Sequence, residues 1–151
     1  MTVTAILESI DTTNYKFISS PFYDWAHAPA TSKGKIGEDI AQSILEAYDY
    51  EVTPRISKEH DRVVDGKKVE IKTAMLKKDS DEYSFYGYDA SEDPHYWLYQ
   101  FVSPESITLI KMDRNSMGNV YLGKTRKNTM FTITPEEMIQ KGGEVVAEYI
   151  V

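Results

Sequence analysis

The chain has no cysteine, which excludes disulfide bonds, zinc–thiolate sites and thiol catalysis. It also lacks any apolar run near the roughly 20 residues that cross a bilayer. Its first ten residues lack the basic segment and long apolar run of a signal peptide. No repeat, low-complexity tract or linker divides its 151 residues, a length typical of one domain. We therefore expect a single domain over residues 1–151, in a cytoplasmic protein without a membrane partner.

Positive charge is scarce: 17 Lys and Arg stand against 24 Asp and Glu, a formal net charge of −7. This balance argues against a protein that coats nucleic acid, because such binding neutralises phosphates with Lys and Arg. The basic residues gather in segments 61–78 and 106–130, whereas segment 79–105 contains none. A local basic surface beside an acidic site is therefore compatible with the overall charge.

The stretch His60–Lys72, HDRVVDGKKVEIK, is typical of a tight β-hairpin. Its centre holds Asp65-Gly66, a pair favoured in two-residue type I′ turns because both positions need positive φ. With that turn, Asp61 lies opposite Glu70, and directly opposed side chains have Cβ atoms about 4.5–5.5 Å apart. Two carboxylates this close destabilise the hairpin unless something compensates for their repulsion.

Side-chain alternation along the second strand adds a lysine to this face. Lys72 shares the face of Glu70, whereas Val69 and Ile71 point to the other, apolar face. A hard divalent cation such as Mg²⁺ would remove the repulsion, since it takes one or two carboxylates and leaves other positions for water and phosphate. The alternative is an ordinary solvated hairpin, and a three-residue loop would shift the register and separate Asp61 from Glu70.

Hydrophobic periodicity predicts a mixed α/β fold. Apolar residues at helical spacing predict an amphipathic helix over Lys35–Asp49, with Glu38 in its first turn. Phe17–Thr31 is expected to be loop, residues 77–94 a long loop or short helix, and Thr134 the N-cap of a short helix. Strands are expected over Tyr50–Ile56, His60–Val64, Lys67–Ala74, His95–Val102, Ile107–Met112, Val120–Leu122 and Met130–Ile133. This order predicts a mixed sheet with the long helix against one face.

These residues together resemble the PD-(D/E)xK nuclease superfamily, in particular its small restriction-endonuclease-like domains. In that pattern a helix carrying a glutamate precedes a sheet whose second strand supplies an aspartate and whose third carries Glu-x-Lys. Here Glu38 lies in the helix, Asp61 begins the second strand, and Glu70-Ile71-Lys72 lies on the third. The following strand-turn-strand, HYWLYQFVSPESITLIKM, is also similar, so the resemblance covers residues 34–112. The sequence departs from the family name at His60, where that name has proline.

The resemblance implies a restriction-endonuclease-like mixed sheet of the αβββαβ type, flanked by helices. It implies a Mg²⁺-dependent DNA endonuclease that hydrolyses phosphodiester bonds, with Mn²⁺ expected to substitute. Asp61, Glu70 and the backbone carbonyl of Ile71 would hold the metal. Lys72 would orient the attacking water and stabilise developing charge, and Glu38 would complete the acidic cluster or position Lys72. The expected catalytic residues are therefore Glu38, Asp61, Glu70 and Lys72.

A second group of basic residues, Lys124, Arg126 and Lys127, is a candidate contact for DNA phosphates, although a solvated loop also explains it. Glu38 has an alternative explanation too, because an acid in a first helical turn interacts favourably with the helix dipole. A homodimer is expected because a twofold symmetric dimer places its two active sites on the two antiparallel strands of DNA. A larger partner that supplies DNA affinity is the alternative for so acidic a chain.

Two other functions stay open. A structure-selective nuclease of the Holliday-junction-resolvase type shares the Glu, Asp and Glu-x-Lys pattern, although such proteins are usually strongly basic. A non-catalytic module that binds DNA or a partner could keep the same fold without cleaving. Mg²⁺-dependent cleavage of supercoiled, linear and branched DNA separates these functions from one another.

Overall fold

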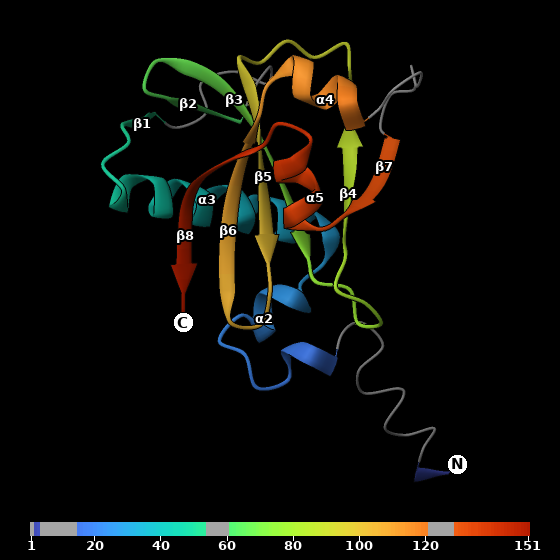
Figure 1. The fold of residues 1–151 in the computed structure, drawn as a ribbon. Helices are drawn as coiled ribbons and strands as arrows, with labels where there is room; N and C mark the ends of the chain where they lie inside the picture. Colours follow the sequence, from blue (N-terminus) through green and yellow to red (C-terminus); the bar gives the residue numbers. More distant parts are fainter. Residues whose placement is uncertain (1, 4–14, 54–60, 121–128) are drawn as a thin grey trace.

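The structure is a computed structural model that describes residues 2–3, 15–53, 61–120 and 129–151. Figure 1 shows the course of the chain. The elements are, in order, η1 (Tyr15–Phe17), α2 (Tyr23–Ala26), α3 (Ala30–Ala47), β1 (Val52–Thr53), β2 (Arg62–Val64), β3 (Lys67–Met75), β4 (Tyr83–Tyr88), β5 (Tyr96–Val102), β6 (Ser106–Met112), α4 (Arg114–Val120), β7 (Thr129–Ile133), α5 (Pro135–Gln140) and β8 (Glu144–Ile150).

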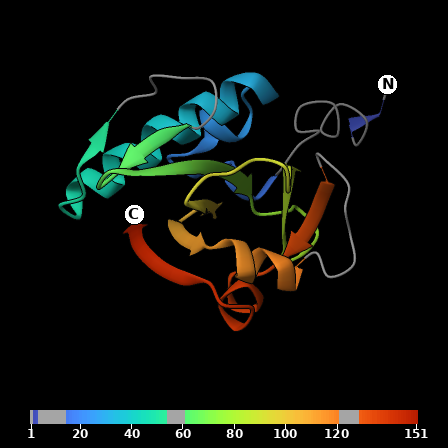
Figure 2. The same cartoon turned by 90° about the horizontal axis from the view of Figure 1, so that it is seen from above.

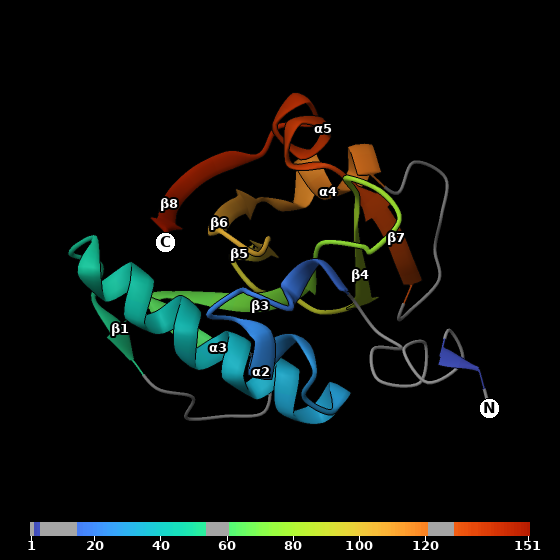
Figure 3. The ribbon, with the colours of Figure 1, turned by 90° about the horizontal axis from the view of Figure 1, so that it is seen from below.

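Six strands of the described ranges form one mixed sheet in the order β1-β2-β3-β5-β6-β8. Neighbouring strands are antiparallel except β3 and β5, which are parallel. Strands β4 and β7 form a separate antiparallel pair. Helices α2 and α3 cover one face of the large sheet, and the β4–β7 pair lies on the other face with α4 and α5 (Figures 2 and 3). The expected mixed α/β fold with a long helix on one face is confirmed.

Strand β5 separates two hydrophobic cores, and all seven of its residues are buried. One set of alternate residues packs beneath α3: Tyr96, Leu98 and Val102. The other set packs beneath the β4–β7 pair: Trp97, Tyr99 and Phe101. A strand that is covered on both faces reads as a continuous apolar run, which explains why this segment was predicted correctly from HYWLYQFV.

The two faces continue onto β3, which lies beside β5. Glu70 pairs with Trp97 and Lys72 with Tyr99, so both side chains lie on the β4–β7 face of the sheet. Val69 and Ile71, which alternate with them, pack on the α3 face. The acid and the lysine therefore share one face of β3, as alternation predicted.

Helix α3 begins at Ala30, earlier than the expected start at Lys35, because Pro29 is extended (φ −55°, ψ 150°) and the helix follows it directly. Glu38 consequently lies in the third turn. Explaining Glu38 by the helix dipole is therefore wrong, since that effect fades beyond the first turn. None of the helices in the described ranges combines the length and apolar character needed to span a membrane.

Gly37 brings α3 directly onto β3. A Cβ atom at residue 37 would overlap the hydroxyl oxygen of Thr73. The amide nitrogen of buried Gln100 donates to the Gly37 carbonyl (2.9 Å) and to Thr73 Oγ1 (3.0 Å). Helix α3 and strands β3 and β5 are thus joined at Gly37, the residue directly before Glu38.

Several expected boundaries are wrong. Residues 77–94 contain β4, whose Tyr83, Phe85 and Tyr88 are buried, so the connection between the parallel strands β3 and β5 includes a strand rather than the helix of an αβββαβ order. The acidic residues on both sides of β4 obscure the pattern of its apolar positions in the sequence. Phe17–Thr31 includes α2 and the start of α3, and Val120 ends α4 instead of beginning a strand.

Other expectations hold in part. Of the strand expected over Tyr50–Ile56, the structure contains Val52–Thr53, and residues 54–56 lie outside the described residues. Strand β8 was not expected at all. The N-cap of α5 is confirmed, because Thr134 Oγ1 accepts from the Glu137 N–H at 3.1 Å.

Candidate active site

The β2–β3 hairpin has the predicted two-residue turn. Asp65 and Gly66 both have positive φ, 48° and 80°, and the register pairs Arg62 with Val69. The predicted register is confirmed over Arg62–Val64, and the alternative three-residue loop is wrong. The backbone N–H of Asp61 donates to the carbonyl of Val69, the partner of Arg62, at 3.1 Å, so Asp61 follows the hairpin just outside its regular pairing.

Asp61 and Glu70 meet across this hairpin. Asp61 Oδ2 accepts a hydrogen bond from the backbone N–H of Ile71, the residue after Glu70 (2.8 Å). Glu70 is buried, with 6% of its surface exposed. The negative charge of Asp61 close to this buried carboxyl group favours the protonated form of Glu70.

The surroundings of Glu70 favour its protonated form. Burial, followed by the negative charges of Asp61 and Glu92, raises the pKa of Glu70 from its ordinary 4.5 to about 8, against the opposing effect of Lys72. At neutral pH the Asp61–Glu70 pair therefore carries close to one negative charge instead of two. A cation that entered between the two carboxyl groups would displace this proton.

Lys72 is oriented by a strand from the other side of the site. Its ammonium group donates to the carbonyl oxygen of Gly87 on β4 at 3.0 Å. Gly87 has φ +82° and lies where the β4–β7 register shifts, between Phe85 and Tyr88. A Cβ atom there would lie 3.3 Å from Lys72 Nζ, in a backbone conformation that favours glycine. A segment that was expected to be loop thus positions the lysine.

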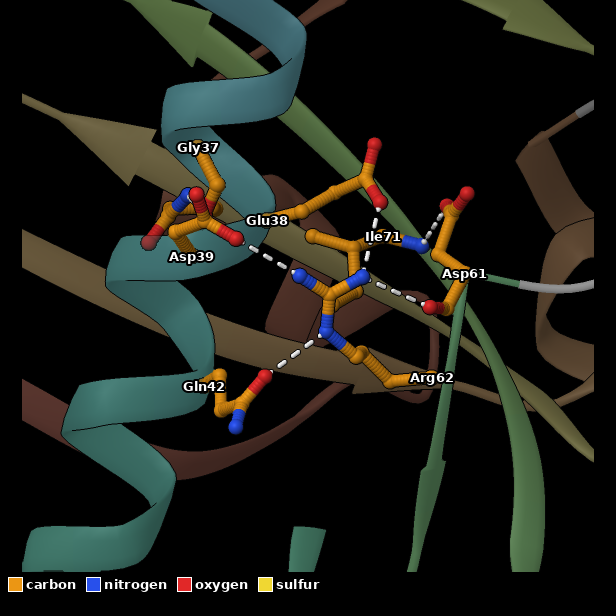
Figure 4. A network of polar contacts seen from close by, with 8 residues as sticks. Gly37, Glu38, Asp39, Gln42, Asp61, Arg62 and Ile71 are labelled. Carbon is orange, nitrogen blue, oxygen red and sulfur yellow. Dashed lines mark hydrogen bonds and ion pairs between the residues drawn. The ribbon is translucent and has the colours of Figure 1, made fainter. Parts of the chain in front are cut away.

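Arg62 joins the hairpin to α3 (Figure 4). It points away from the face of Asp61 and is 8% exposed. Its guanidinium donates to four oxygens: Glu38 Oε1 (3.0 Å), Asp39 Oδ1 (2.7 Å), Gln42 Oε1 (2.8 Å) and the Asp61 carbonyl (2.8 Å). The rigid fork of an arginine suits several acceptors at once. Arg62 therefore fixes the start of β2, and with it Asp61, against the helix.

Glu38 reaches the same corner of the site from α3. The Arg62 nitrogen that bonds Glu38 also bonds the Asp61 carbonyl, so Glu38 lies next to the backbone of Asp61. In Figure 4 the Glu38 and Asp61 carboxyl groups flank the backbone nitrogen of Ile71. The structure thus links Glu38 to Asp61 through Arg62, and its role in an acidic cluster or in positioning Lys72 stays a prediction.

A loop before β5 adds a further acid near the pair. Glu92 contributes to the raised pKa of Glu70. Arg114 holds the loop, because its guanidinium donates to the carbonyls of Ala90 and Glu92 and lies 5.0 Å from the ring centroid of Trp97. The negative potential at Glu70 is therefore built from two separate segments of chain.

Sequence reasoning missed Arg62, Gly87 and Glu92. Arg62 had a signal, because alternation places it on the apolar face of the hairpin, where an arginine needs acceptors. Gly87 and Glu92 had none, since both approach Glu70 and Lys72 only through the folding of β4 and the loop that follows.

Other expected site residues are placed differently or not at all. The backbone N–H of Ile71 faces Asp61, and in a strand the carbonyl of the same residue points to the same side. Lys124, Arg126, Lys127 and His60 lie outside the described residues. Within the described ranges, no group of three or more His, Asp or Glu side chains is arranged to hold a metal ion. The site offers two carboxyl groups.

A cleft of about 720 Å³ lies along the end of β3. It begins at Thr73, the residue after Lys72, and does not include Asp61 or Glu70. Its walls are residues 26–34 of α2 and α3, residues 73–79 at the end of β3, and the outer face of the β4–β7 pair. The carboxyl groups of Asp61 and Glu70 therefore lie outside the cleft, and strand β3 connects them to it.

Comparison with solved structures finds similarity to "the structure of a bacterial homing endonuclease", I-Ssp6803I, with a TM-score of 0.51 and 14% sequence identity. The match covers 71% of this chain and 76% of that one. Over this part, the chain and that protein are similar in fold. No family model matches the sequence, and no curated protein matches it either.

Proposed function

We propose that the chain is a Mg²⁺-dependent DNA endonuclease with a PD-(D/E)xK-type site, in which Asp61, Glu70 and Lys72 act together. The observation that carries this proposal is the position of the Asp61 carboxylate, which the Ile71 N–H holds close to Glu70, with Lys72 on the same face of β3. The similarity of fold to a protein named as a homing endonuclease supports DNA as the substrate.

The donor set fits a hard divalent cation. Asp61 and Glu70 supply carboxylate oxygens, and the Ile71 carbonyl is an additional oxygen on the same edge of β3; Mg²⁺ prefers such ligands and keeps several waters. The raised pKa of Glu70 also supports a cation site. The negative charges around this buried carboxyl group favour a bound proton, and a divalent cation would compensate those charges better. When bound, Mg²⁺ supplies Lewis acidity to a phosphate oxygen and lowers the pKa of water.

The protein's own groups then have separate roles. Lys72, held by the Gly87 carbonyl, places a positive charge beside the acids, where it stabilises the charge that develops on the phosphate. Asp61 keeps its orientation through the Ile71 N–H and through Arg62, which holds its carbonyl. Glu70 would have to be deprotonated to hold a cation, so cleavage is expected to increase toward alkaline pH.

The test is cleavage of supercoiled, linear and branched DNA by the full chain, with Mg²⁺, Mn²⁺ or EDTA. We expect metal-dependent cleavage that Asp61→Asn reduces by about 100-fold or more. Asp65→Asn is the matched control, because this aspartate of the same hairpin serves the turn, and its oxygen that accepts from the Glu51 N–H is kept in asparagine.

The outcome distinguishes the proposed function from its alternatives. Preferential cleavage of branched DNA would identify the chain as a structure-selective nuclease. DNA binding without cleavage under any metal, together with unchanged Mg²⁺ affinity in Asp61→Asn, would leave a non-catalytic binding module. The mass of the active species in solution tests the homodimer that cutting both strands favours.

A further inference from the structure

Two apolar side chains are left exposed in the cleft that begins at Thr73. Tyr86 is 68% exposed and Met130 is 48% exposed, and both line the cleft. Alternation explains their position: their neighbours Phe85 and Phe131 fill the core on the inner face of the β4–β7 pair, so Tyr86 and Met130 occupy the outer face. Exposed apolar side chains that are grouped in a concave wall, such as this tyrosine and this methionine, are typical of a binding surface.

The same cleft carries a local excess of positive charge on a chain of net charge −7. Its charged lining residues are Lys33, Lys77, Lys78 and Asp79. The turn that presents two of these lysines is held in place, because Lys16 Nζ donates to the carbonyls of Lys77 (2.8 Å) and Ser80 (2.6 Å). The charge is therefore presented from a fixed backbone.

The cleft has the size and surface of a ligand site. Its volume of about 720 Å³ lies within the roughly 300–1,000 Å³ of small-molecule pockets. Lysines next to a tyrosine and a methionine suit a ligand that is flat and apolar in one part and anionic in another. A nucleotide has this combination, because base faces stack on aromatic rings while phosphates pair with lysine.

We propose that this cleft binds an unpaired segment of a DNA strand, with bases against Tyr86 and Met130 and phosphates at Lys33, Lys77 and Lys78. Bases in a duplex are stacked on their neighbours, so a ring at the surface reaches a base face only where pairing is absent or broken. The inference rests on the proposed function, since β3 leads from the cleft at Thr73 to Lys72 and Glu70, and the bound strand is proposed to continue to these residues.

The test is fluorescence anisotropy of labelled oligonucleotides with the full chain in EDTA, where no cleavage intervenes. We expect single-stranded DNA to bind more tightly than a duplex of the same sequence. Tyr86→Ala should weaken single-strand binding by about 5- to 150-fold, as loss of one stacking contact does, and Tyr86→Phe should keep it. Lys78→Ala should reduce the salt dependence of binding, with a slope smaller by about 0.7.

Two matched controls lie outside the cleft. Tyr149→Ala removes another half-exposed tyrosine, on β8, and Lys67→Ala removes an exposed lysine at the hairpin turn. Both variants should bind single-stranded DNA with nearly the same affinity and the same salt slope as the unaltered chain. Unchanged affinity in Tyr86→Ala, equal or tighter duplex binding, tighter RNA binding, or no binding at all would overturn the inference.

The inference and the proposed function fail separately. If the chain binds single-stranded DNA through Tyr86 but cleaves no DNA with Mg²⁺, the nuclease proposal is refuted and the binding cleft is supported. If it cleaves DNA with a metal ion but its binding does not depend on Tyr86, the binding cleft is refuted and the nuclease proposal is supported.

Discussion

Asp61 Oδ2 accepts a hydrogen bond from the Ile71 N–H at 2.8 Å, which holds the Asp61 carboxylate close to Glu70. Two acids so placed need a counter-charge. Because the pKa of Glu70 is raised to about 8, a proton partly neutralises the pair at neutral pH. In the proposed function, this proton occupies the position that a cation would take.

The first prediction concerns stability and pH. The pKa of Glu70 is raised to about 8 in the folded chain from an ordinary 4.5. The folded state thus binds a proton more tightly than the unfolded state, so this contribution to stability is full below about pH 4.5 and is lost as pH rises through about 8. In EDTA, Glu70→Gln should therefore gain stability over the unaltered chain between pH 5 and pH 8, as measured by thermal unfolding.

The control for this prediction is Glu105→Gln, at an exposed glutamate far from the hairpin in sequence. Its unfolding temperature should follow that of the unaltered chain at every pH. Adding Mg²⁺ at pH 8 should raise the unfolding temperature of the unaltered chain and not that of Glu70→Gln. Parallel pH curves for the chain and Glu70→Gln would contradict the assignment of the proton.

The second prediction concerns Lys72. If its ammonium stabilises charge that develops during cleavage, Lys72→Met should lower kcat by about 100- to 1,000-fold and change KM little. Lys67→Met, at the exposed end of the same hairpin, should leave both values unchanged. A rise in KM alone would mean that Lys72 only helps to bind DNA.

The third prediction concerns Gly87, which orients Lys72. Gly87→Ala should cost about 1–2 kcal/mol in the free energy of unfolding, because φ is +82°. It should also lower kcat, because the new Cβ lies 3.3 Å from Lys72 Nζ. Urea unfolding and cleavage rates measure the two effects. Gly118→Ala, in α4 with no atom within 4 Å of the added Cβ, should instead gain up to about 1 kcal/mol and cleave normally.

The fourth prediction concerns Arg62 as a positioning residue. Lysine cannot bond four oxygens in fixed geometry, so Arg62→Lys should lower the affinity for Mg²⁺ by about 10- to 100-fold, the usual cost of losing support behind a metal ligand. Calorimetric titration with Mg²⁺ measures this without cleavage. Asp39→Asn is the control, because Asp39 is 62% exposed and should contribute less than about 1 kcal/mol to stability. Equal affinities in both variants would limit Arg62 to a structural role.

The local parts of this site were predictable from the sequence. An Asp-Gly pair demands positive φ, and a two-residue turn leaves one register, so the meeting of Asp61 with Glu70 followed from turn chemistry. Alternation then placed Lys72 beside Glu70. The strand β5 was predictable as well, since a strand buried on both faces needs apolar residues throughout.

The remaining parts depend on contacts between distant segments. Strand β4 was missed because its apolar positions lie among acidic residues, and it becomes a strand only by pairing with β7. The start of α3 was misplaced because Gly34 reads as a helix boundary, yet it lies inside the helix.

By itself, the sequence determined which groups stand on one face of the hairpin, because turn geometry and a period of two act over a few residues. Only the tertiary structure decided how those groups are held: Lys72 by Gly87, and Asp61 by Arg62 and α3. It also decided the protonation of Glu70, because burial and the charge of Glu92 depend on how the chain packs around the carboxyl group.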